Sequence, residues 1–162
     1  MVKEESDLEK FKKEYSKLET KHKLPTFDEL NKDFQIEKIA EVESDFLIRE
    51  IRKAISDKPY TYLRFVETLI NPANAPMSVL SLVKTLGSNE KDKLAEVYKK
   101  LVRNEAMLIE ADIDFSEDKE AKFINETYTM WQEIKKDLLE VLAVVNKSWD
   151  NKSETNGKNY FG

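Results

Sequence analysis

Arginine is scarce in this chain, and three of its four arginines are spaced so that they could bind an anion. The sequence holds 23 Lys and four Arg, and a guanidinium group offers planar, bidentate donation that an ammonium group lacks. Arg49 and Arg52 share one face of an expected helix, and Arg64 lies in the next one. Arg49, Arg52 and Arg64 are therefore candidate anion-binding residues. The alternative is salt bridging to the many acids, for example by Arg52 across two helices. We favour it because a phosphate-binding domain is usually basic, whereas this chain is net acidic.

Oxygen-bearing side chains occupy alternate positions from Asp112 to Glu120, between two expected helices. This spacing resembles an EF-hand calcium loop, in which such side chains bind the cation. Two positions depart from that pattern, since Glu117 stands where the loop needs glycine and Phe123 where it needs a bidentate Glu. We therefore favour a structural interpretation, in which Ser116 caps a helix, the acids complement its dipole and Asp118 pairs with Lys122. No metal site is predicted.

The single histidine ends a Glu19-Thr20-Lys21-His22 segment, which matches the Glu-x-x-His unit of carboxylate di-iron bundles. Those sites need two such units, and one chain with one His cannot supply the second. No Ser and carboxylate pattern around His22 indicates a catalytic triad, and the chain has no Cys to act as a nucleophile or zinc ligand. We predict a protein without enzymatic activity and without a cofactor.

An apolar stripe near the N-terminus is the candidate surface for binding a partner. Leu8, Phe11, Tyr15 and Leu18 follow a 3-4-3 spacing, which predicts one narrow face of an amphipathic helix. The stripe spans less than two heptads, too few for a stable free coiled coil. The helix therefore docks either on its own domain or on a partner, and the sequence does not choose between them.

Helical periodicity continues along the chain. Thr26 and Glu29 form a capping box that starts a helix at Phe27. One helix is expected from Asp45 and another from Pro59, because proline suits the first position of a helix. The segment Met77 to Leu86 is apolar on nearly every side and is expected near the centre.

Two longer helices are expected in the second half. One begins at Ser88, and the last follows Ser116 and keeps a 4-3 apolar alternation from Ile124 to Trp149. Lys-, Ser- and Asn-rich sequence without periodicity then begins at residue 150. We predict an all-α, single-domain helical bundle of about five to seven helices with a long C-terminal helix. Its parts are an N-terminal helical arm (1–23), the bundle (24–149) and a disordered polar tail (150–162).

Composition narrows the function classes. Three Gly exclude Gly-rich phosphate loops of the G-x-G-x-x-G kind. Neither a secretory signal nor a run long enough to span a membrane is visible, so the expected location is the cytoplasm. The formal net charge is −5, and eight acids against two lysines between Asn104 and Glu126 account for all of that excess.

The predicted function is a helical protein-interaction or adaptor module that presents charged helix faces to a protein partner. The alternative is a nucleic-acid-associated protein that uses Arg49, Arg52 and Arg64 together with the cluster Lys99, Lys100 and Arg103. The acidic net charge favours the protein partner. If charge guides recognition, the acidic segment between the last two helices is where a cationic partner or ion would bind.

Overall fold

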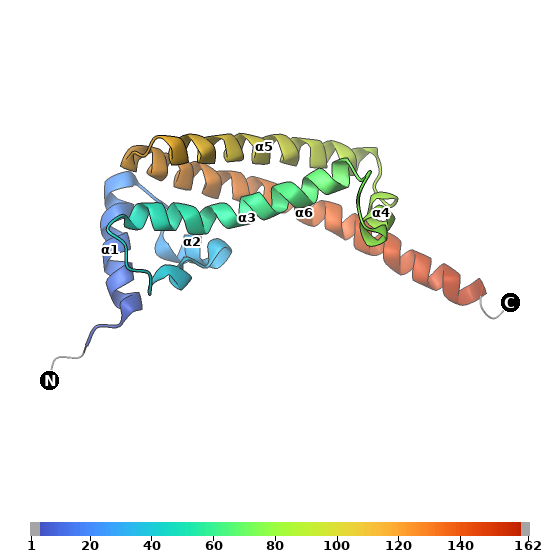
Figure 1. Cartoon of the computed structure of the whole chain (residues 1–162). Coiled ribbons are helices and arrows are strands. Elements are labelled where there is room, and N and C mark those ends of the chain that lie inside the picture. The colour runs from blue at the N-terminus through green and yellow to red at the C-terminus, as the bar shows by residue number, and fades with distance from the viewer. Residues whose placement is uncertain (1–3, 160–162) are drawn as a thin grey trace. The chain divides into compact units, whose positions relative to one another are not determined.

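The computed structural model describes the backbone of residues 4–159 and the side chains through residue 151. In chain order the elements are α1 (Asp7–His22), α2 (Phe27–Phe34), the 3₁₀ helix η1 (Ile36–Ile39), α3 (Leu47–Ile70), α4 (Met77–Val83), α5 (Ser88–Ile113) and α6 (Glu117–Asn159) (Figure 1). Residues 4–159 contain no β-strand. The prediction of an all-α helical bundle with a long C-terminal helix is confirmed.

The described residues form two compact units, one of residues 4–61 with 103–131 and one of residues 62–102 with 132–159. The helices α3, α5 and α6 each contribute a stretch to both units. The arm, bundle and tail expected from the sequence stay a prediction. None of the helices in the described part of the chain is both long and apolar enough to cross a membrane.

In the first unit, α1 is held by its own chain. Phe11 and Tyr15 are buried and make edge-on contacts with Phe27 of α2, at 5.6 and 6.0 Å between ring centroids. The Tyr15 hydroxyl donates a hydrogen bond to the carbonyl of Pro25. The N-terminal helix therefore docks on its own unit through half of its apolar stripe.

The turn between α1 and α2 is specified locally. Lys23 ends α1 in the left-handed conformation, at a φ of 53°. The predicted capping box is confirmed, because the Glu29 amide donates to the Thr26 hydroxyl and the Thr26 amide donates to the Glu29 carboxylate. Leu30 and Phe34 then face the core from α2.

The expected helix start at Pro59 is wrong, since α3 continues through this residue. Proline removes one amide donor from the helical ladder. The apolar stripe nevertheless runs unbroken past it, because Ile51, Ile55, Pro59 and Leu63 are spaced four apart and all are buried. The free energy gained by burying this continuous apolar row outweighs the loss of one backbone hydrogen bond at Pro59.

The expected central position of Met77 to Leu86 is also wrong. The helix α4 has no buried residue and Met77 is 74% exposed, while only Leu86, after the helix, is buried. Apolar residues on every side of a seven-residue helix cannot all face one core.

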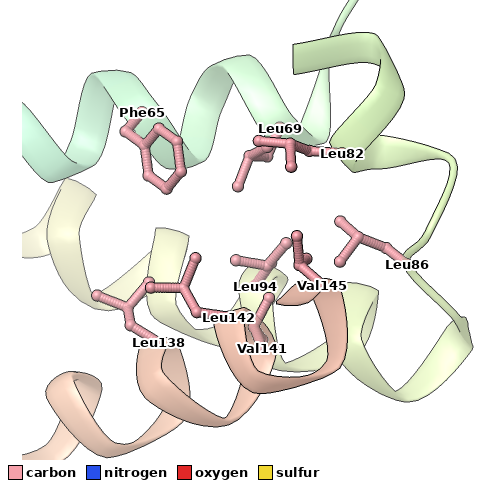
Figure 2. A pocket seen from close by; sticks show the side chains of 9 residues that line it. All are labelled: Phe65, Leu69, Leu82, Leu86, Leu94, Leu138, Val141, Leu142 and Val145. Carbon is pink, nitrogen blue, oxygen red and sulfur yellow. The ribbon is translucent and has the colours of Figure 1, made fainter. Parts of the chain in front are cut away.

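An apolar pocket of about 20 Å³ lies in the second unit, which is room for about one water. Figure 2 shows its side chains converging from four helices and from the turn after α4. They are Phe65, Leu69, Leu82, Leu86, Leu94, Leu138, Val141, Leu142 and Val145. With this volume and no polar anchor, the pocket is a small packing gap in the apolar core of the second unit.

The long α6 helix extends beyond the predicted bundle. Its backbone is helical through Asn159, so helix covers most of the segment in which the sequence predicts a disordered tail. The side chains from residue 152 onward, and residues 160–162 as a whole, lie outside the described part.

Candidate functional site

Two aromatic residues of the first unit are held at helix starts with their rings exposed. Phe46 precedes α3, where its carbonyl accepts hydrogen bonds from the amides of Arg49 and Glu50. The Phe46 amide donates to the hydroxyl of Ser44. Because these bonds satisfy the backbone, the position of Phe46 is fixed while its side chain stays 56% exposed.

Phe115 lies in the joint between α5 and α6. Ser116 caps α6, as predicted, by accepting a hydrogen bond from the Lys119 amide at 3.1 Å. The Phe115 ring is 39% exposed and meets the Phe46 ring edge-on at 5.5 Å between centroids. The guanidinium of Arg49 lies 5.3 Å from the centroid of Phe115, a cation–π distance that fixes the ring.

These rings border a groove of about 360 Å³ in the first unit. Its apolar lining comes from α1, from the start of α3 and from the α5–α6 joint, and charged side chains complete it. The lining residues are Glu14, Lys17, Leu18, Lys21, Asp45, Phe46, Leu47, Ile48, Phe115 and Glu117. A volume in this range suits a small ligand or a few side chains of a protein partner.

One wall of the groove is fixed by ion pairs between α1 and α6. His22 is only 7% exposed, and its Nε2 lies 2.7 Å from Oε1 of Glu117. The Lys21 ammonium donates to the same oxygen at 2.8 Å. Hydrogen bonds from Lys21 and His22 hold the pKa of Glu117 below its ordinary value. Asn125 of α6 also donates to the backbone carbonyl of His22, so the C-terminus of α1 is tied to α6 by several contacts.

The candidate anion-binding arginines already contact carboxylates. Arg52 is 4% exposed, and its Nε donates to Oε2 of the fully buried Glu120 at 2.7 Å. Nη2 groups of Arg52 and Arg49 lie 3.4 and 3.8 Å from Oδ1 of Asp112. The expected salt bridge of Arg52 across helices is confirmed. Arg64 belongs to the second unit, where it pairs with Glu67 at 3.0 Å.

The alternating acids from Asp112 to Glu120 do not converge on one point. Asp112 and Glu120 contact arginines, Asp114 pairs with Lys119, and the side chain of Asp118 is 96% exposed. No group of three or more potential metal ligands occurs among the described residues. Sequence order alone therefore does not make this segment a calcium loop.

The expected pairing of Asp118 with Lys122 is wrong. The Lys122 ammonium lies 3.8 Å from Glu126, and the neighbour of Asp118 is instead Nδ1 of His22 at 3.8 Å. His22 comes from α1, so this contact depends on how α1 packs on α6.

The structure separates the four residues of the predicted partner-binding stripe. Phe11 and Tyr15 face the core, Leu8 is half-buried, and Leu18 is half-buried and lines the groove. The principal groove aromatics, Phe46 and Phe115, were not singled out from the sequence. The available signal was a phenylalanine in an acidic segment just before a helix, which occurs at both positions.

No protein-family model, curated protein or solved structure matches this chain.

Proposed function

We propose that the protein is a non-enzymatic, helical protein-interaction module in the cytoplasm, and that the groove of the first unit is its docking site. The observation that carries this proposal is the exposed Phe46 and Phe115 pair beside a groove of about 360 Å³. Aromatic residues, Phe included, are enriched in the cores of protein–protein interfaces. Leu18 adds an apolar contact from the stripe that the sequence indicated.

The ionisable side chains around the groove support binding over catalysis. Glu117 is engaged by Lys21 and His22, and Lys17 is paired with Glu14 at 2.6 Å. These contacts position the groove walls and engage four of the five ionisable side chains of the lining, so that, in the described part of the chain, Asp45 alone among them is left without a partner for acid–base chemistry.

The arginine geometry favours a protein partner over nucleic acid. Phosphate binding needs an accessible guanidinium. Arg52 is nearly inaccessible and Arg49 is engaged by Asp112 and Phe115, which leaves Arg64, 48% exposed and paired with Glu67, as the accessible one of the three candidates. A low-salt mobility-shift assay with duplex DNA and single-stranded RNA tests the alternative, and we expect no complex.

Substitution of an exposed aromatic tests the docking proposal without removing a buried side chain. We expect Phe46→Ser to abolish the capture of specific proteins from lysate, as measured by crosslinking and quantitative mass spectrometry. Ile109→Ser is the matched control, because Ile109 is 53% exposed, belongs to the same unit and does not line the groove. The proposal fails if no protein is captured above the background of empty beads, or if both variants capture the same proteins as the unmodified chain.

A further inference from the structure

The groove aromatics belong to two segments that carry only acidic charges. Residues 41–46 contain three acids, residues 110–118 contain five, and neither segment contains a lysine or arginine. The contact between Phe46 and Phe115 joins these segments within the first unit. We call residues 41–46 and 110–118 together the acidic aromatic surface.

Internal pairing neutralises only part of this surface. Asp112 contacts two arginines, Asp114 pairs with Lys119, and Glu117 pairs with Lys21. The acids of residues 41–46, in contrast, make no ion pair with any residue in the described part of the chain, and all three are exposed. They are Glu41, Glu43 and Asp45.

The lysines that line the groove do not reverse this imbalance. Lys17 is held by Glu14 at 2.6 Å and Lys21 by Glu117 at 2.8 Å. Each of these two lysine charges is therefore offset by a carboxylate that also lines the groove. An approaching ligand meets exposed apolar rings beside uncompensated negative charge, which attracts cations and repels polyanions.

Resting on the proposed function, we propose that the acidic aromatic surface docks a Lys- and Arg-rich amphipathic helix. Its apolar face would contact Phe46, Phe115 and Leu18, and its basic residues would face the acids of residues 41–46. Helix-in-groove docking is the mode that this fold offers, because residues 4–159 contain no strand edge that an extended peptide could join. Basic charge on the partner gives fast association and selects against acidic partners, and the apolar face supplies the buried hydrophobic contact.

The test uses the full chain and three labelled peptides of about 18 residues, or about five helical turns. The first places Leu on one face and Lys on the other. The second has the same composition in scrambled order, and the third keeps the apolar face but replaces Lys with Glu. Fluorescence anisotropy measures the affinity of each peptide, and chemical-shift changes in the NMR spectrum locate the site.

We expect the basic amphipathic peptide to bind at least about tenfold more tightly than the scrambled one, and the acidic peptide not to bind. Affinity falls as salt rises from about 50 to about 300 mM, because screening shortens the range of these charges. The largest shifts are expected at the amides of Phe46 and Phe115.

Two variants with matched controls assign the contacts. Glu43→Lys should weaken binding of the basic peptide by about tenfold. Asp92→Lys makes the same charge change at an exposed acid outside the acidic aromatic surface, and it should have little effect on this binding. Phe46→Ser should also weaken binding of the basic peptide, whereas Ile109→Ser should leave that binding unchanged.

Three results would overturn the inference: equal binding of the scrambled peptide, tighter binding of the acidic one, or no binding of the basic one at about 1 mM. If protein capture still depends on Phe46 in any of these cases, the proposed function stands and only the basic helical partner is wrong. If capture and peptide binding are both absent, both proposals fail.

Discussion

The ion pair between Arg52 and Glu120 predicts a large loss of stability when its charge balance is broken. Arg52 is 4% exposed and Glu120 is fully buried, and two hydrogen bonds of 2.7 and 3.4 Å join them. Glu120→Gln preserves the side-chain volume but leaves the guanidinium without its buried counter-charge. Removing one member of a buried pair costs about 3–5 kcal/mol in general. We expect about 3 kcal/mol here, at the lower end of that range, because Asp112 remains 3.4 Å from Arg52.

An exposed pair supplies the control. Arg64 and Glu67 lie 3.0 Å apart with both side chains about half exposed, so Glu67→Gln should cost less than about 1 kcal/mol. The double variant Arg52→Met with Glu120→Leu removes both charges and keeps an apolar volume. It should recover most of the loss, because burying two charges has its own desolvation cost.

Urea denaturation measures these differences in the free energy of unfolding. Trp131 is buried in the same unit as the ion pair and becomes the only tryptophan in a Trp149→Phe background. Its fluorescence reports on the first unit, and circular dichroism reports on all helices. If Glu120→Gln and Glu67→Gln cost the same, or if the double variant is less stable than Glu120→Gln alone, the reasoning is refuted.

Further outcomes are expected for Tyr15, Glu117 and Leu86. Tyr15→Phe should cost about 1 kcal/mol in urea denaturation, because the partly buried carbonyl of Pro25 loses its side-chain donor. Burial raises the pKa of Tyr15 above the ordinary value of 10.0, so the phenol proton is lost from the unfolded chain before it is lost from the folded one. The free energy of unfolding should therefore decline above about pH 10, and it should decline less steeply in Tyr15→Phe. Hydrogen bonds from Lys21 and His22 lower the pKa of Glu117 from 4.5. The stability that this carboxylate contributes is therefore present above pH 4.5 and lost as pH falls through the folded-state pKa. The stability difference between Glu117→Gln and the unmodified chain should shrink in acid, and a constant difference would contradict the assignment. Leu86→Ala should cost about 2–5 kcal/mol because Leu86 is buried, whereas Met77→Ala, at a strongly exposed site, should change stability by less than about 0.5 kcal/mol.

Local sequence rules predicted the elements whose determinants are close together in the chain. The Thr26 and Glu29 capping box depends on residues three apart, and Ser116 caps the helix that follows it. Those rules failed at Pro59, where a local preference for a helix start was overridden by a buried row that continues on both sides. They also failed for Met77 to Leu86, since composition gives apolarity but not the surface available to bury it.

The candidate site was predictable only in part, because its contacts join distant positions. Leu18 was identified from helical spacing, and the acidic excess between the last two helices was visible as charge. The contact of Phe46 with Phe115 and that of His22 with Glu117 each join residues more than 60 positions apart. No periodicity or cap encodes such a pair.

The amino-acid sequence by itself determined the helical class, the caps, the long last helix and the acidic segment, because each depends on spacing within a few turns or on simple charge. Tertiary structure alone decided which apolar residues became core and which became surface. It buried Phe11 and Tyr15 of the N-terminal stripe, left Phe46 and Phe115 exposed as a pair, and engaged Arg52 with Glu120. The physical reason is that burial depends on which distant helix covers a side chain, and that choice is made by packing of the folded chain.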